Sequence, residues 1–169
     1  IARYFGSRDY KRMKTAIFTS IIGFLALAIA LSAFGLIFSK NLMALLQTPS
    51  EILDMAVLYL NIYFYGLPFL FMYNIISALY QALGESKIPL YFLIFSSVLN
   101  VILDVYFVRD LGLGLAGAAY ATLLAQGLSA IFSFCVFIMR IGKIETQKTK
   151  IFDKEELGLI SRLAIPSIV

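Results

Sequence analysis

The chain has no histidine, a single cysteine and few charged residues. Without histidine, the histidine routes to metal binding, nucleophile activation and a switch near neutral pH are closed. Cys135 stands alone in an apolar stretch, so the chain cannot form an internal disulfide or a thiolate metal site. Only 14% of the residues are charged, and they gather in short clusters. A soluble domain needs a charged exterior over most of its surface, so these absences argue against a soluble enzyme.

Hydrophobic residues make up 61% of the chain and concentrate in four long runs that contain no Lys or Arg. Each run reaches the length of about 20 residues that a helix needs to cross a hydrocarbon core. Barrel strands of about 10 residues alternate polar and apolar side chains, and these runs do not. The sequence therefore predicts an all-α, polytopic transmembrane helix bundle with helices at about residues 15–39, 55–84, 88–108 and 111–139.

Basic residues give the expected orientation of this bundle. They cluster in residues 1–14 and 140–156, and the positive-inside rule places both segments in the cytoplasm. We interpret residues 1–14 as the end of a preceding helix and a basic loop, and residues 140–156 as a charged linker between two bundles. Residues 157–169 are the expected start of a further helix, so we expect a piece of a longer protein. The net charge of +4 fits this topology and contact with membrane lipid, and it requires no nucleic-acid partner.

The third apolar run carries polar residues where lipid disfavours them. Asn100 and Asp104 lie four residues apart, so in a helix they share one face, with Ser97 a turn earlier. A carboxylate within the membrane usually faces a cavity, a partner or an ion path. Oxygen ligands of this kind suit Na⁺, and a lone carboxylate suits a proton, so the stripe indicates ion coupling. Alternatively, Asp104 could reach the outer interface or pair with Arg109.

The fourth run places Gly114, Ala118, Thr122 and Gln126 on one helical stripe. Small residues at this spacing let two helices approach closely in lipid, and that packing explains the Gly and Ala positions better than the Thr and Gln positions. The connector between the third and fourth runs is short, so the two helices must be antiparallel neighbours. A site shared by Asp104 and Thr122 is therefore geometrically possible.

The second run contains a proline near its middle and several amides. Pro68 should kink or loosen this helix. Asn74, together with Gln126 of the fourth run, is predicted to face a substrate cavity. An interhelical hydrogen bond is an equal alternative for Asn74.

Several stretches resemble the multidrug and toxic compound extrusion (MATE) family, and the resemblance covers nearly the whole chain. ARYFGSRDYKRMKTAI resembles the end of the family's second helix and the basic loop after it. ALYQALGESKIPLY resembles the connection between the fourth and fifth helices. GLAGAAYATLLAQ is similar to the start of the sixth helix, and ISRLAIPSIV to the entry of the seventh.

This resemblance implies part of the N-terminal lobe of a twelve-helix, two-lobe exporter of the cell membrane that works by alternating access. It implies no cofactor, only Na⁺ or H⁺ as coupling ion, and small drugs or toxic metabolites as exported compounds. Asn100 and Asp104 match the family's cation-site pair in the fifth helix. Thr122 and the backbone carbonyl of Ala118 match the family's cation-site positions in the sixth helix. If the ion is Na⁺, the side chains of Asp104, Asn100 and Thr122 would be its metal ligands. The family's remaining Asp lies in its first helix, so the missing remainder of the chain would complete the site.

Two alternatives stay open. A lipid-linked oligosaccharide flippase of the same superfamily should carry basic residues inside the membrane to hold a pyrophosphate, and the four runs have none. A non-transporting membrane scaffold predicts that Asp104→Asn leaves function unchanged, whereas bulky changes at Gly117 or Ala121 disrupt assembly.

Overall fold

The computed structural model describes residues 1–144 and 149–164. All regular elements in these residues are helices, which confirms the predicted all-α fold. In chain order they are α1 (Ala2–Gly6), α2 (Tyr10–Leu45), α3 (Leu53–Ala82), α4 (Lys87–Asp104), the π-helical segment η1 (Val105–Asp110), α5 (Gly114–Gly142) and α6 (Lys154–Ala164). Four of these stretches, with α4 and η1 taken together, are long and apolar enough to cross a membrane.

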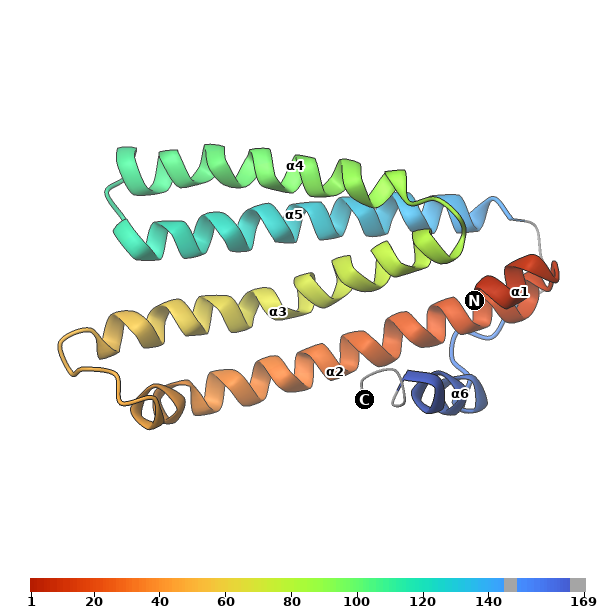
Figure 1. Cartoon of the computed structure of the whole chain (residues 1–169), viewed down its shortest axis with the longest axis horizontal. Helices are drawn as coiled ribbons and strands as arrows, with labels where there is room; N and C mark the ends of the chain where they lie inside the picture. Colours follow the sequence, from red (N-terminus) through yellow and green to blue (C-terminus); the bar gives the residue numbers. More distant parts are fainter. Residues whose placement is uncertain (145–148, 165–169) are drawn as a thin grey trace.

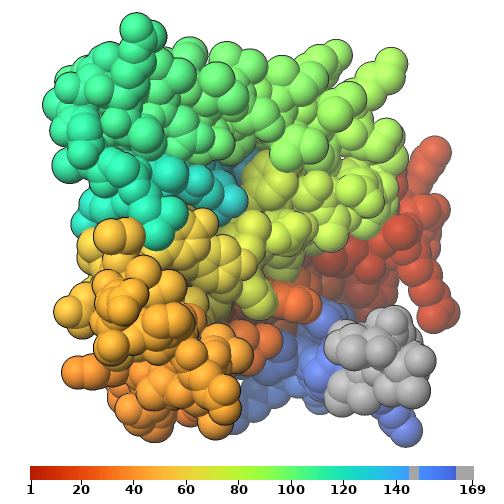
Figure 2. All heavy atoms as spheres, turned by 60° about the vertical axis from the view of Figure 1, so that its left-hand side comes forward, coloured from red at the N-terminus to blue at the C-terminus, as the bar shows by residue number. Residues whose placement is uncertain are grey.

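The four long helices run up and down, and α5 lies between α4 and α3, with α2 packed on the other side of α3 (Figure 1). The space-filling view shows the same order, with α4 above α5 and α2 below α3 (Figure 2). The α2–α3 and α4–α5 connectors lie at one end of the bundle. The other end carries α1, α6 and the α3–α4 connector (Figure 1). This alternation matches the predicted placement of the basic segments on one side, which we call the basic end.

Helix ends extend beyond the predicted apolar runs. The first long helix begins at Tyr10 because the Asp9 side chain accepts a hydrogen bond from the Arg12 N–H at 3.1 Å. Basic residues expected in a loop, among them Lys14, therefore lie in the first turns of α2. Hydropathy detects the lipid-facing part of a helix, whereas a helix continues into water until a cap or turn ends it.

The last two predicted segments also differ from the observed bounds. Helix α5 continues to Gly142, and α6 begins at Lys154, within the predicted linker 140–156. Residues 145–148 of that linker and 165–169 of the predicted next helix lie outside the described residues.

The main hydrophobic core lies toward the basic end. Here α2, α3 and α5 meet, and the Tyr80 and Phe137 rings pack edge to face with centroids 5.1 Å apart. Both rings are fully buried. The core consists of Met13, Ile17, Ile21, Ile76, Leu79, Tyr80, Phe137 and Ile141.

Helix α4 instead presents a row of exposed apolar side chains, such as Tyr91 at 65% and Val101 at 61%. That row is the surface expected to face lipid. The opposite face of α4 packs on α5, and there the polar residues lie.

Candidate ion site between α4 and α5

Asn100 and Asp104 lie on the inner side of α4. Both are partly buried, whereas the neighbouring Val101 and Ile102 are 61% and 59% exposed. The one-turn spacing predicted from the sequence therefore brings the amide and the carboxylate to the face that meets α5.

Thr122 of α5 joins this face through two hydrogen bonds. The Asn100 amide Nδ2 donates to Thr122 Oγ1 at 3.3 Å, and the Thr122 hydroxyl donates to the Ala118 carbonyl at 3.0 Å. The Asn100 amide nitrogen is used in the hydrogen bond to Thr122. The Asn100 carbonyl oxygen, which can only accept, is therefore the atom of this side chain that can face a cation. The structure thus brings together three of the four residues predicted for the site, Asn100, Thr122 and Ala118.

Asp104, the fourth predicted residue, carries a buried oxygen. Its Oδ1 atom is shielded from solvent and has no hydrogen-bond partner among the described residues. None of the ion pairs found in the described chain joins Asp104 to Arg109. A buried, unpaired carboxylate oxygen is costly in hydrocarbon, so the absence of an ion pair with Arg109 disfavours the local-pairing alternative, and this oxygen is the group at which a cation or proton would act.

Sequence reasoning missed the backbone next to this carboxylate. It expected the helix to end near Val108, whereas the chain after Asp104 forms the π-helical segment η1 to Asp110. Such segments are rare and occur often at functional sites. The glycines of the following connector indicated a turn, and the residue pattern gave no sign of the π-helical segment.

The two residues predicted to face a substrate cavity share only a small space, and one of them also lines a larger cavity. Asn74 is exposed and lines an apolar cavity of about 470 Å³ between α2 and α3, together with Phe24 and Phe71. Gln126 does not line that cavity. It meets Asn74 only at a smaller space of about 150 Å³ that Ser129 also lines. The Asn74 amide donates to the Leu70 carbonyl of its own helix at 2.9 Å, so among the described residues its hydrogen bond lies within α3 and not between helices.

Pro68 lies inside α3, whose axis changes direction near its middle (Figure 1). A proline has no N–H to donate to the carbonyl four residues earlier, which here belongs to Phe64. The Ser32 hydroxyl of α2 donates to that carbonyl at 2.7 Å. Gly35 lies about one turn further along α2, where an added Cβ would clash with the Phe64 ring. The sequence marked the proline but gave no sign of this partner helix.

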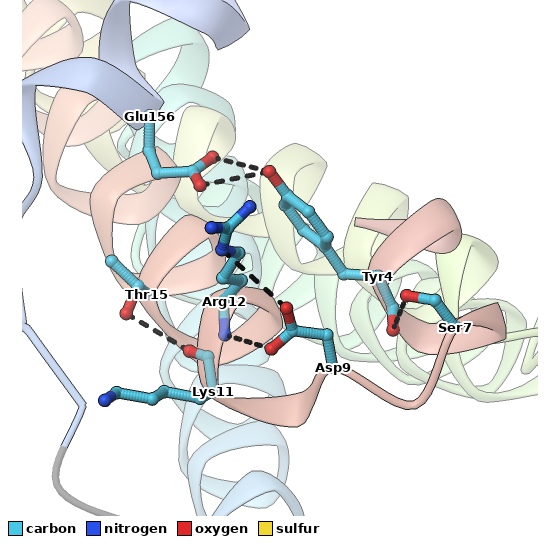
Figure 3. Close-up of polar contacts among 7 residues, drawn as sticks. All are labelled: Tyr4, Ser7, Asp9, Lys11, Arg12, Thr15 and Glu156. Carbon is cyan, nitrogen blue, oxygen red and sulfur yellow. Dashed lines mark hydrogen bonds and ion pairs between the residues drawn. The ribbon is translucent and has the colours of Figure 1, made fainter.

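At the basic end, hydrogen bonds hold α6 and the residue before it against α1 and α2, and Figure 3 shows the bond between Glu156 of α6 and Tyr4 of α1. The Tyr4 hydroxyl donates to the Glu156 carboxylate at 3.0 Å, and the Asp153 N–H donates to Thr19 Oγ1 at 3.1 Å. Burial, followed by the bond to Glu156, raises the pKa of the Tyr4 hydroxyl. The Glu155 N–H, followed by Lys150, lowers the pKa of the Asp153 carboxyl. The described end of the predicted charged linker is therefore attached to the bundle by hydrogen bonds.

Comparison with known proteins agrees with these elements. The MatE family model matches residues 1–106. The chain is 36% identical, over 96% of its length, to the probable multidrug resistance protein YpnP of Bacillus subtilis, and it covers 36% of that protein. It is 29% identical, over its whole length, to the multidrug export protein MepA of Staphylococcus aureus, and it covers 38% of it.

A solved structure supports the same relationship. The fold superimposes with a TM-score of 0.86 and 26% identity on the outward-facing conformation of a multidrug resistance MATE family transporter of the MOP superfamily, over 98% of this chain and 37% of the other. The chain thus spans little more than a third of the length of these relatives. Its four apolar helices, the family model and the shared fold together show that this multi-pass membrane protein belongs to the MATE (MatE) family.

Proposed function

We propose that the chain forms the core of the N-terminal lobe of a secondary exporter, which couples influx of Na⁺ or H⁺ to efflux of amphipathic, often cationic compounds. The observation that carries the proposal is the buried, unpaired Oδ1 of Asp104, one helical turn after Asn100, whose side chain is hydrogen-bonded to Thr122. The multidrug names of the relatives YpnP and MepA support the export of drugs or toxic metabolites.

The polar groups at this site suit either ion. For Na⁺, a hard cation, the oxygen ligands would be the Asp104 carboxylate, the free Asn100 carbonyl oxygen and a lone pair of the Thr122 hydroxyl. The Ala118 carbonyl orients that hydroxyl by accepting its proton at 3.0 Å. For H⁺, protonation of Asp104 would neutralise the charge that lipid disfavours.

The cavity between α2 and α3 suits an amphipathic compound. It measures about 470 Å³, within the range of small-molecule sites, and its apolar wall includes Phe24 and Phe71 with Asn74 as a polar group. The missing remainder of the chain would form the rest of the wall. Ion binding can favour one orientation of the lobes only if the two orientations differ in their affinity for the ion.

No observation on the described residues favours the flippase or the scaffold alternative. A flippase would need basic side chains within the bundle to hold a pyrophosphate. Lys14, a buried lysine of α2, is already engaged because its ammonium donates to the Ile144 carbonyl just past α5, at 2.6 Å. A scaffold would need no unpaired carboxylate oxygen at Asp104.

The test uses the full-length protein in liposomes loaded with a fluorescent cationic drug, with a Na⁺ gradient and a pH gradient imposed separately. Asp104→Asn should abolish efflux driven by the coupling gradient. The matched control is Asp54→Asn, at an exposed carboxylate in the first turn of α3. Efflux by Asp104→Asn at the level of this control would refute the coupling role, and the gradient that drives the unmodified protein identifies the ion.

A further inference from the structure

The backbone directly after Asp104 departs from α-helical geometry. Segment η1 runs from Val105 to Asp110, and the Leu111 N–H donates to the Tyr106 carbonyl, five residues back, at 3.0 Å. A π turn widens the helix by about one residue per turn relative to an α-helix and so changes where neighbouring side chains point. Asp104 itself has α-helical dihedrals and ends α4, so the π turn that follows sets the path of the chain from Asp104 to α5.

Helix α5 packs against the backbone of the π turn at Gly117. Gly117 is buried, and a Cβ added there would lie 3.0 Å from the carbonyl carbon and oxygen of Phe107 and 3.0 Å from Leu113 Cβ. The neighbours of the other packed glycines are side chains. Gly127, also in α5, has Phe69 ring atoms at 3.8 Å, an ordinary contact distance. Alanine at position 117 would need the Phe107 backbone to give way by a few tenths of an ångström, and a backbone carbonyl cannot rotate away as a side chain can.

This contact lies between the two halves of the candidate site. Phe107 follows Asp104 by three residues, and Gly117 precedes Ala118, the residue whose carbonyl accepts the Thr122 hydroxyl. A shift at the contact moves the carboxylate relative to the threonine. We propose that Gly117 is a positioning residue, which holds the π turn where Asp104 can share an ion with Asn100 and Thr122.

A purely structural role makes a different prediction. Ala121 and Ala125 of α5 are fully buried, so close helix packing in this region does not depend on an ion site. If Gly117 served packing alone, Gly117→Ala would lower the amount of folded protein or the maximal transport rate. It would leave the ion dependence unchanged.

The experiment therefore separates ion dependence from maximal rate in the full-length protein in liposomes. The variants are Gly117→Ala, its matched control Gly127→Ala and Asp104→Asn. Gly117→Ala should raise the half-saturating concentration of the coupling ion by about tenfold or more, the range seen when groups that orient ion ligands are lost. The control should keep the unmodified value. A Gly117→Ala variant with unchanged ion dependence would overturn the inference.

A second variant keeps the inference testable if Gly117→Ala does not fold. Deleting Val108, an exposed residue of η1, removes the extra residue of the π turn and should move the ion dependence in the same direction. If neither variant folds while Gly127→Ala does, the contact is structural and the inference is wrong.

The inference rests on the proposed function, and the two can fail separately. If Asp104→Asn transports normally, the proposed function itself fails. If Asp104→Asn is inactive and Gly117→Ala matches Gly127→Ala, only the positioning role fails.

Discussion

The hydrogen bond from Ser32 to α3 predicts an energetic coupling between two helices that can be measured directly. Pro68 leaves the Phe64 carbonyl without its usual helical donor, and the Ser32 hydroxyl supplies one at 2.7 Å. Ser32 is only 7% exposed, so water cannot readily replace the hydroxyl. We predict that Ser32→Ala destabilises the protein, and that most of this cost disappears when Pro68 is also replaced by alanine.

The expected loss of stability in Ser32→Ala follows from the Phe64 carbonyl, which the substitution leaves without a donor. Removing one partner of a buried hydrogen bond costs about 1–3 kcal/mol, and interhelical bonds in membrane proteins average about 0.6 with a maximum near 1.7 kcal/mol. We therefore expect about 1–1.5 kcal/mol for Ser32→Ala. In the Pro68→Ala background, residue 68 has an N–H that can reach the Phe64 carbonyl. The same change should then cost less than about 0.5 kcal/mol, for a coupling energy of about 1 kcal/mol.

The assay is a double-mutant cycle on the free energy of unfolding of the full-length protein in micelles. Ser39→Ala is the matched control, because Ser39 is also buried in α2 but donates to the Leu36 carbonyl of its own helix at 3.2 Å. Its cost should be the same with and without Pro68. An equal cost of Ser32→Ala in both backgrounds would show that the hydroxyl does not substitute for the missing N–H.

Two pH dependences follow at the basic end. The pKa of Tyr4 is raised above its ordinary value of 10.0, so the contact between α1 and α6 should be complete below that pH and be lost as the pH rises through the raised pKa. Tyr4→Phe should remove this alkaline transition from the distance between spin labels on α1 and α6, and a transition that persists would contradict the role of the Glu156 bond. The pKa of Asp153 is lowered from 3.8, so its contribution is present above that pH and lost as the pH falls through the lowered value. Asp153→Asn keeps a capping oxygen that does not titrate, so protease cleavage near α6 should lose its acid-induced increase, and an unchanged increase would refute the prediction.

Hydropathy predicted the fold because lipid imposes a simple rule. A backbone in hydrocarbon must satisfy its own hydrogen bonds, so each uncharged or nearly uncharged run of sufficient length was expected to be a helix. The same rule says nothing about the aqueous ends, where local caps decide. Asp9 begins α2 earlier than the apolar run, and Gly84, with φ +82°, ends α3 in a left-handed turn.

The candidate site was predictable where it depends on spacing. The short connector predicted that the two helices are neighbours and that Asp104 and Thr122 could share a site. In the structure the residue of α4 that bonds to Thr122 is Asn100, at 3.3 Å, a partner that only the family resemblance had implied. Ser32 was not predictable, because a serine in an apolar run gives no sign of which distant carbonyl it meets. Periodicity reports which face a residue occupies, and it does not identify the partner across the interface.

The π turn shows why the spacing of ligands alone does not define this site. The chain reverses direction between η1 and α5 through Gly112 and Gly114, with φ +65° and +54°, which glycine adopts at little cost. Within the same connector the Leu113 N–H donates to the Phe107 carbonyl at 3.0 Å, and that carbonyl lies against Gly117. Each residue can be recognised in the sequence as turn-forming or small. Their contacts, however, join positions four to ten residues apart, and these separations follow no regular helical repeat that a sequence pattern would reveal. The same Asn and Asp on a chain with a longer, unrestrained connector would therefore not predict a site opposite threonine.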